Sequence, residues 1–223
     1  MNEDPHSHFT PHAVVRRILK GRGGSPAGRA EGRAPVNIAL VKYWGKRDER
    51  LNLPVTSSLS VSLAGLETRT EISAGAGPDT MELDGRLLEA DHPALRRVST
   101  FLELFRPDPG IGFRLCSRNS VPTAAGLASS ASGFAALVRA LDGLFGWSLP
   151  ARELSILARL GSGSACRSLF PGFVQWQAGQ AADGMDSYAE PLSERWPELR
   201  IGLWVIESGP KPVSSREAMR HTV

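Results

Sequence analysis

PTAAGLASSAS, residues 122–132, is a run of small side chains and hydroxyl groups that leads into an apolar-periodic segment. Small side chains leave backbone N–H groups accessible, and a helix N-terminus carries partial positive charge, so such a loop suits a phosphate or another anion. The alternative is a tight loop that only lets the helix pack closely, and the run alone does not separate the two. Apolar residues follow at helical spacing and predict a helix over residues 127–145: Phe134, Leu137, Val138, Leu141, Leu144 and Phe145.

Two further stretches combine small, polar and basic residues. Residues 34–48, APVNIALVKYWGKRD, end an apolar strand in a cluster of basic and aromatic groups, and residues 161–168, GSGSACRS, form a second small-residue loop. Together with the 122–132 run, with LNLP at 51–54 and with VSS at 213–215, they resemble the diphosphomevalonate decarboxylases of the GHMP kinase superfamily. The resemblance runs from about residue 34 to residue 223. It implies an α+β fold, the GHMP-kinase N-terminal domain that is similar to domain 2 of ribosomal protein S5.

The composition is that of an ordinary globular protein, with 41% hydrophobic and 22% charged residues. No apolar run approaches the ~18 residues that a membrane span needs, and the start has no signal-peptide core, so we expect no membrane partner. The two cysteines, Cys116 and Cys166, are too few for a disulfide framework. A reducing, cytoplasmic setting fits them best.

The net charge of +3 comes entirely from residues 1–33, which hold six Lys or Arg and three Asp or Glu, whereas residues 34–223 carry 20 of each sign. Because the body is neutral and the basic part lacks interleaved aromatic residues, we expect no nucleic-acid partner. Residues 1–33 are rich in Gly, Arg and Pro and show little apolar periodicity, which predicts a disordered basic tail. His6, His8 and His12 could hold a metal there, but we interpret them as part of a solvated tail and assign no metal site.

Hydrophobic patterns predict strands mixed with separated helices, which is typical of α+β proteins. Strands are expected at 36–41, 59–63, 69–73, 112–117, 173–177 and 201–207, with a turn near 64–65. Asp84-Gly85 predicts a hairpin turn. Helices are expected from Pro93 to a stop at 107–110, over 127–145, over 150–160 and from 214 to 219.

The resemblance implies that the small-residue loop binds ATP with Mg²⁺. The expected nucleotide-binding residues are Ala124, Ala125, Gly126, Leu127, Ala128, Ser129 and Ser130. Ser129 and Ser130 could donate hydroxyl groups to phosphate oxygens or complete a Mg²⁺ shell. Helix capping is the structural alternative for both serines.

The resemblance also implies a diphosphate-holding stretch made of Tyr43, Trp44, Gly45 and Lys46. A lysine is a mobile point charge suited to phosphate, and a glycine lets the chain approach the ligand closely. Lys42 is similar to the family's active-site lysine, which would stabilise charge on the transferred phosphoryl group. A strand end with solvated lysines is the alternative interpretation of the whole stretch.

Arg167 is the strongest candidate for catalysis. Its planar guanidinium binds a carboxylate in bidentate fashion and stays charged, and the resemblance implies that it engages the mevalonate carboxylate. We expect Arg167 to be exposed, and a surface ion pair is the alternative role. The other substrate-binding residues that the resemblance implies are Ser162, Gly163, Ser164, Ala165, Cys166, Ser215 and Arg216. A nucleophilic role for Cys166 is disfavoured because no base is near it in sequence.

Family members continue into a C-terminal ferredoxin-like domain that carries an Asp acting on the tertiary hydroxyl, and no residue here matches that motif. We therefore interpret the chain as ending before that domain, either as an N-terminal fragment or as a genuinely truncated protein. Residues 1–223 alone are expected to bind the ligands weakly and to release no carbon dioxide. An uncovered apolar face would favour self-association, and a homodimer is one way to cover it.

The expected reaction is phosphorylation of the tertiary hydroxyl of 5-diphosphomevalonate, followed by loss of phosphate and carbon dioxide to give isopentenyl diphosphate. A relative that acts on mevalonate or its monophosphate, and an inactive binding remnant, are the alternatives.

Overall fold

A computed structural model describes residues 9–22, 24–120 and 129–202. The helices are α1 (Pro11–Ile18), α2 (Pro93–Leu102), α3 (Ser129–Phe145) and α4 (Ala151–Gly161), followed by a 3₁₀ helix, η1 (Gly163–Leu169). The strands are β1 (Arg29–Val41), β2 (Lys46–Asp48), β3 (Leu53–Pro54), β4 (Ser58–Ala76), β5 (Thr80–Leu83), β6 (Arg86–Leu87), β7 (Ile111–Asn119), β8 (Phe173–Trp176) and β9 (Ala189–Pro191). Mixed strands and separated helices confirm the α+β prediction.

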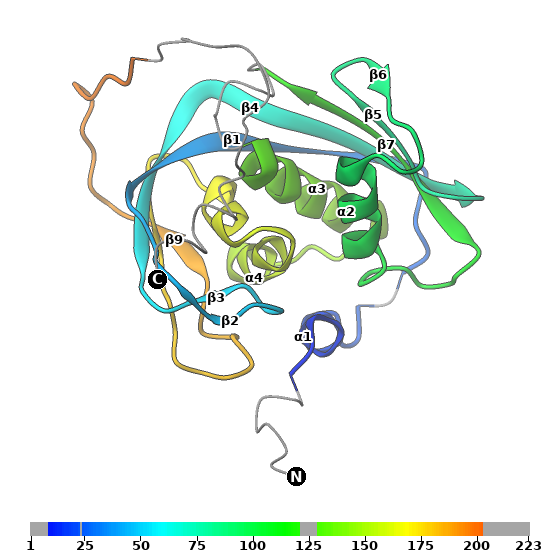
Figure 1. The fold of residues 1–223 in the computed structure, drawn as a ribbon, viewed down its shortest axis with the longest axis horizontal. Coiled ribbons are helices and arrows are strands. Elements are labelled where there is room, and N and C mark those ends of the chain that lie inside the picture. The colour runs from blue at the N-terminus through cyan, green and yellow to red at the C-terminus, as the bar shows by residue number, and fades with distance from the viewer. Residues whose placement is uncertain (1–8, 23, 121–128, 203–223) are drawn as a thin grey trace.

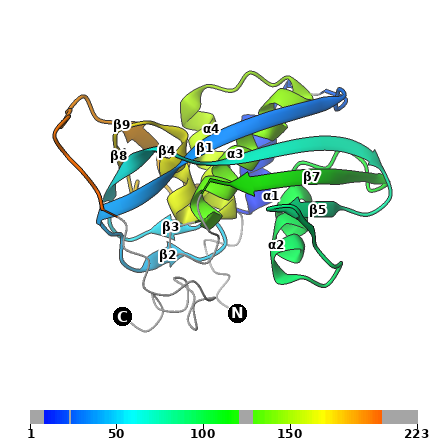
Figure 2. The same cartoon turned by 90° about the horizontal axis from the view of Figure 1, so that it is seen from above.

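The main sheet has seven strands in the order β6-β5-β7-β4-β8-β9, with β1 paired to β4. Every pair is antiparallel except β5 with β7. β4 organises the sheet: along one side it pairs with β1, and along the other it pairs first with β8 and then with β7. The sheet curves around α2, α3 and α4 (Figure 1). Figure 2 shows β1 and β4 running alongside each other, with α2 beneath β5 and β7.

The expected turn near 64–65 is wrong, because the two predicted strands form the single strand β4. Gly65 has φ +77° and lies between Ser62, which pairs with Asn37, and Glu67, which pairs with Pro35, so β4 has four residues where β1 has one. The positive φ therefore accommodates a bulge in a continuous strand instead of reversing the chain.

The remaining predicted elements largely match. The helices predicted from Pro93, over 127–145 and over 150–160 are α2, α3 and α4. The hairpin turn is confirmed, with Asp84 at φ +50° and Gly85 at φ +84° between paired Leu83 and Arg86. The strand expected at 201–207 lies almost wholly, and the helix at 214–219 entirely, outside the described residues. The loop expected at 161–167 is instead the end of α4 and the buried 3₁₀ helix η1.

The prediction of a disordered tail over residues 1–33 is wrong for much of that segment. α1 begins after Thr10, whose side chain accepts a hydrogen bond from the Ala13 N–H, and it buries Val14, Val15 and Ile18 in the core. β1 already begins at Arg29 and pairs with β4. The basic and glycine-rich composition obscured a short amphipathic helix that buries only three residues.

The core lies between the sheet and the helices, and α3 is its centre. Ala131, Ala135, Ala136 and Ala140 of α3 are fully buried. A Cβ on Gly32 of β1 would lie 2.1 Å from the Ala136 carbonyl oxygen, so β1 and α3 touch backbone to backbone. This close approach fixes the position of α3 against the sheet. Within the described ranges, none of the helices is both long and apolar enough to span a bilayer.

Candidate active site

Arg167 is buried in η1, which corrects the expectation of an exposed side chain: only 2% of the residue is accessible. One guanidinium nitrogen donates to the Ser58 hydroxyl at 2.5 Å, and the other lies 3.5 Å from Asn37 Oδ1. Its Nε has no hydrogen-bond partner among the described residues, and no ion pair found there includes it. Burial lowers the pKa of this guanidinium below its usual value. The site therefore contains a desolvated cation whose charge lacks a neighbouring carboxylate in the described structure.

Asn37 connects β1 to η1 beneath Arg167. Its amide nitrogen donates to the Ser168 hydroxyl at 2.6 Å and to the Ser164 carbonyl at 3.3 Å, while its amide oxygen faces Arg167. Ser58 reaches the same guanidinium from β4. Sequence reasoning missed both residues, although a polar residue inside the apolar strand 36–41 was an available signal for Asn37.

Trp176 forms the wall of this site and is fully buried at the end of β8. The Tyr43 ring meets it edge-on with centroids 4.8 Å apart, and the Arg167 guanidinium carbon lies 5.9 Å from its ring centroid. The structure thus brings Tyr43 and Arg167, two predicted site residues, onto one indole. Sequence reasoning missed Trp176 because a tryptophan in an apolar strand is indistinguishable from ordinary core.

The stretch 42–46 leaves β1 and turns at Gly45, which has φ +65°. Lys42 and Trp44 are exposed, whereas Tyr43 is half-buried. Lys46 is held by Asn52 Oδ1 at 2.9 Å and by Glu49 at 3.1 Å. Its ammonium group is therefore fixed at the base of the β2–β3 hairpin. Glu49 is largely exposed, so an anionic ligand can displace its carboxylate from Lys46.

The segment from Ser162 through η1 to Arg167 faces inward over most of its length. Ser162 is buried, Ser164 is half-buried, and Ala165 and Cys166 are fully buried. The Cys166 thiol donates to the Gly163 carbonyl at 3.0 Å, and burial raises its pKa to about 12. A neutral, inaccessible thiol is no nucleophile. Because the side chains of Ala165 and Cys166 face the core, their predicted substrate role is restricted to backbone groups.

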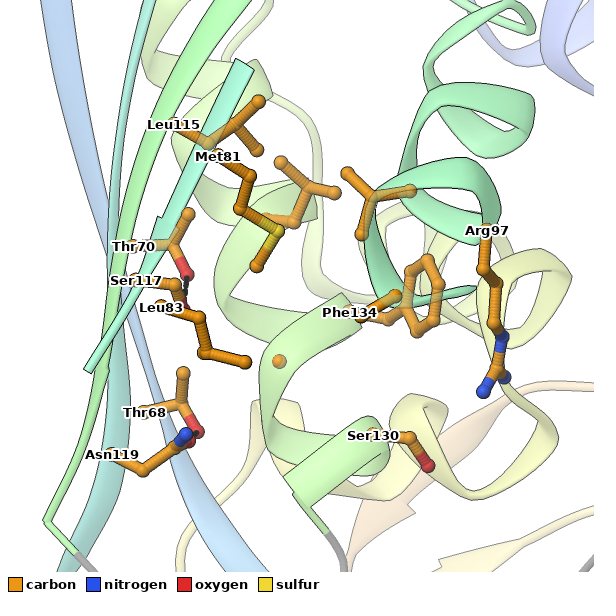
Figure 3. A pocket seen from close by; sticks show the side chains of 14 residues that line it. Thr68, Thr70, Met81, Leu83, Arg97, Leu115, Ser117, Asn119, Ser130 and Phe134 are labelled. Carbon is orange, nitrogen blue, oxygen red and sulfur yellow. Dashed lines mark hydrogen bonds between the residues drawn. The ribbon is translucent and has the colours of Figure 1, made fainter. Parts of the chain in front are cut away.

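A cavity of about 260 Å³ opens between the sheet, α2 and the first turns of α3. Apolar walls from Met81, Leu83, Leu115 and Phe134 meet a polar edge that includes Ser130 (Figure 3). Thr70 and Ser117 share a hydrogen bond at 3.0 Å on the sheet side. Of the predicted nucleotide-binding residues, only Ser129 and Ser130 lie in the described part, and Ala124, Ala125, Gly126, Leu127 and Ala128 lie outside it, as do Ser215 and Arg216.

A family model described as "Diphosphomevalonate decarboxylase-like N-terminal domain" matches residues 34–189. The chain belongs to this family. The matched residues include the Arg167 site and the stretch 42–46, and the resemblance inferred from the sequence motifs is confirmed.

Individual relatives agree with the family model. The diphosphomevalonate decarboxylase of Eremothecium gossypii is 46% identical over 210 residues, covering 85% of this chain and 52% of that protein. The chain thus spans about half the length of the curated relatives it matches. The crystal structure of mevalonate diphosphate decarboxylase from Staphylococcus aureus has a TM-score of 0.73 at 37% identity, covering 86% of this chain and 58% of that one. A complex of MDDEF with MVAPP, AMPPCP and magnesium has a TM-score of 0.71 at 41% identity, covering 86% and 60%.

Proposed function

We propose that the protein takes part in ATP-dependent decarboxylation of 5-diphosphomevalonate to isopentenyl diphosphate. The buried guanidinium of Arg167 is the observation that carries this proposal. Burying an unpaired cation costs free energy unless a ligand supplies a compensating negative charge. The planar guanidinium of Arg167 matches the geometry of a carboxylate. The names of the relatives, and the MVAPP complex of a neighbour at 41% identity, support the same substrate.

In this proposal Arg167 orients the substrate carboxylate next to the tertiary hydroxyl. Phosphorylation of that hydroxyl gives a good leaving group. When phosphate leaves, the bond between the carboxylate carbon and its neighbour breaks, and its electron pair forms the alkene as carbon dioxide departs. A bidentate guanidinium holds the carboxylate in the plane that this fragmentation requires, which is a positioning effect. Ser162 and Ser164 are proposed to hydrogen-bond the same end of the substrate.

The diphosphate end is proposed to bind Tyr43, Trp44, Gly45 and Lys46. Gly45 already adopts a conformation that favours glycine, and Lys46 already has a fixed ammonium group. Lys42, exposed beside them, is proposed to stabilise charge on the transferred phosphoryl group. Ser215 and Arg216 remain predictions for further contacts with the diphosphate.

The nucleotide is proposed to bind at the N-terminus of α3. The neighbouring cavity has apolar walls and a polar edge, which suit a purine base, and Ser129 and Ser130 end the predicted phosphate loop where α3 begins. Mg²⁺ would neutralise charge on the phosphates. The described residues contain no group of three or more His, Cys, Asp or Glu that could hold a metal, so no ligand for it is assigned within them.

A cytoplasmic location and a homodimer are further parts of the proposal. Both cysteines are free, which is compatible with a reducing compartment. Leu40, Val41, Trp44 and Val55 expose half or more of their area around the site, and a second copy of the chain could cover them. Light scattering at two protein concentrations would test this assembly.

Calorimetric titration of residues 1–223 with mevalonate, its monophosphate and its diphosphate tests the substrate. We expect the diphosphate to bind most tightly, and we expect Arg167→Leu to remove that binding. Equal affinity for all three ligands would favour the alternative of a mevalonate or phosphomevalonate relative. A carbon dioxide release assay with ATP and Mg²⁺, run beside a full-length family member, separates binding from turnover.

A further inference from the structure

Trp176 touches the parts of the site that must be aligned with one another, although they come from different elements. Tyr43 follows β1, Arg167 lies in η1, and Ser58 begins β4 directly opposite Trp176 in the sheet register. Tyr43 meets the indole edge-on at 4.8 Å, and Arg167 lies over it at 5.9 Å. A shift of this single ring would therefore displace both proposed substrate contacts.

The indole is itself fixed by a hydrogen bond from its N–H group. Its N–H donates to the Ser187 hydroxyl at 3.1 Å, and that hydroxyl donates to the Gln177 carbonyl at 3.0 Å. The backbone at Ser187 is held by a second buried arginine, Arg159, which donates to the carbonyls of Ser187 at 2.6 Å and Gly184 at 2.7 Å. A turn with no proposed substrate contact thus determines the rotation of the ring.

Space around the ring leaves it little freedom. A Cβ on Gly163 would lie 3.0 Å from the Trp176 ring and 3.2 Å from the Tyr43 hydroxyl. The absence of a side chain at residue 163 is what lets the tyrosine and the tryptophan meet at the start of η1. A ring locked by packing and by a hydrogen bond can hold a cation in one place.

We propose that Trp176 is a positioning residue that sets the relative placement of Arg167 and Tyr43, with Ser187 fixing the indole. This rests on the proposed function, because the alignment matters only if both residues bind one substrate. The cation needs such support because its hydrogen bonds within the site leave Nε unpartnered among the described residues.

The test compares two ligands that share a diphosphate but differ at the carboxylate end: 5-diphosphomevalonate and isopentenyl diphosphate. The measured quantity is the ratio of their affinities in wild type, Trp176→Phe, Ser187→Ala and Arg167→Leu. A purely structural defect weakens both ligands alike, whereas misplacement of Arg167 weakens only the carboxylate ligand. We expect Trp176→Phe to lower the ratio about tenfold and Ser187→Ala to lower it by a smaller factor. Trp147→Phe, at a tryptophan that is also buried but stacks on Phe145, is the matched control and should leave the ratio unchanged.

A measurement without ligand separates this inference from the proposed function. The Arg167 Nε–H resonance, assigned by its loss in Arg167→Leu, should shift in Trp176→Phe and stay in place in Trp147→Phe. An unchanged resonance together with an unchanged affinity ratio in Trp176→Phe overturns the positioning role. If wild type shows no preference for the carboxylate ligand while the resonance still shifts, the proposed substrate is wrong, but Trp176 still positions Arg167.

Discussion

Replacing Arg167 with leucine should nearly preserve stability while removing substrate binding. The side chain is a buried cation with one short hydrogen bond, to Ser58, and one long contact, to Asn37. Replacing a buried ion pair by apolar residues of similar volume is often neutral or stabilises a protein by about 1–4 kcal/mol, and we expect a gain of at most this size when leucine replaces the desolvated Arg167 cation. Leaving the Ser58 hydroxyl unsatisfied costs about 1–3 kcal/mol. The two effects oppose each other, so the net change should stay within about 2 kcal/mol.

The assay has two parts. For a chain of this size, 1 kcal/mol corresponds to about 2–4 °C in Tm, so thermal unfolding of Arg167→Leu should shift by less than about 8 °C. Calorimetric titration should show that affinity for 5-diphosphomevalonate falls at least about 30-fold, because losing one partner of a buried charge pair costs about 2–5 kcal/mol. Arg167→Lys should also bind 5-diphosphomevalonate poorly, because an ammonium group cannot make the two parallel hydrogen bonds that a guanidinium makes to a carboxylate.

Arg159 provides the matched comparison for stability. It is equally inaccessible, and burial lowers its pKa to about 10, but it donates two short hydrogen bonds to backbone carbonyls. Arg159→Leu should therefore destabilise the fold more than Arg167→Leu does. If Arg167→Leu unfolds like Arg159→Leu, the guanidinium is structural, and if it binds substrate like wild type, the carboxylate assignment is refuted.

Three further changes test other parts of the structure. Burial raises the pKa of Cys166 from 9.0 to about 12, so its contribution to stability is complete below pH 9 and is lost as the pH rises toward 12. Between pH 8 and 10, the free energy of unfolding of Cys166→Ala, measured in urea, should therefore fall by about 1.4 kcal/mol less than that of wild type. The same fall in both proteins would contradict this. Gly163→Ala should cost about 1 kcal/mol and alter the near-ultraviolet circular dichroism of Trp176, because the new Cβ lies 3.0 Å from that ring; an unchanged spectrum would show that the ring tolerates it. Asn52, at φ +52°, donates to two carbonyls of α4, so Asn52→Gly should lower the free energy of unfolding by about 1–3 kcal/mol in denaturant titrations. Asn52→Ala should lower it by about 1 kcal/mol more, because alanine is strained at a positive φ. Equal losses in the two variants would show that the backbone conformation costs nothing.

The elements with a clean local signal were predictable from the sequence. The periodicity behind the 122–132 run predicted α3, and Asp84-Gly85 predicted the β5–β6 turn, because both depend on neighbours in sequence. The strand β4 was misjudged at Gly65, where pairing with β1 continues through a residue that locally looks like a turn. α1 was missed because its stability comes from burial of a few side chains against the core.

The site shows the same division between local and long-range information. Arg167 stands out by residue type in a small-residue stretch, and Tyr43 and Lys46 stand out in a cluster of basic and aromatic groups. The structure brings Tyr43 and Arg167 together. The burial of Arg167 could not be predicted, because it depends on Asn37 and Ser58 from other strands. Trp176 was missed for the same reason, since only its neighbours in space distinguish it from core.

The pairing of distant strands also determines when the site can exist during synthesis. The Arg167 contact joins residues 109 apart in sequence, and β8 pairs with β4 across a similar separation. At about 5–20 residues per second, a ribosome needs roughly 5–20 s to add that stretch. Contacts of such long range form late, because loop closure precedes any gain from pairing. The nascent chain therefore contains β1 and β4 for many seconds before η1 and β8 complete the pocket, and during that interval the edge of β4 that begins at Ser58 lacks its partner strand β8.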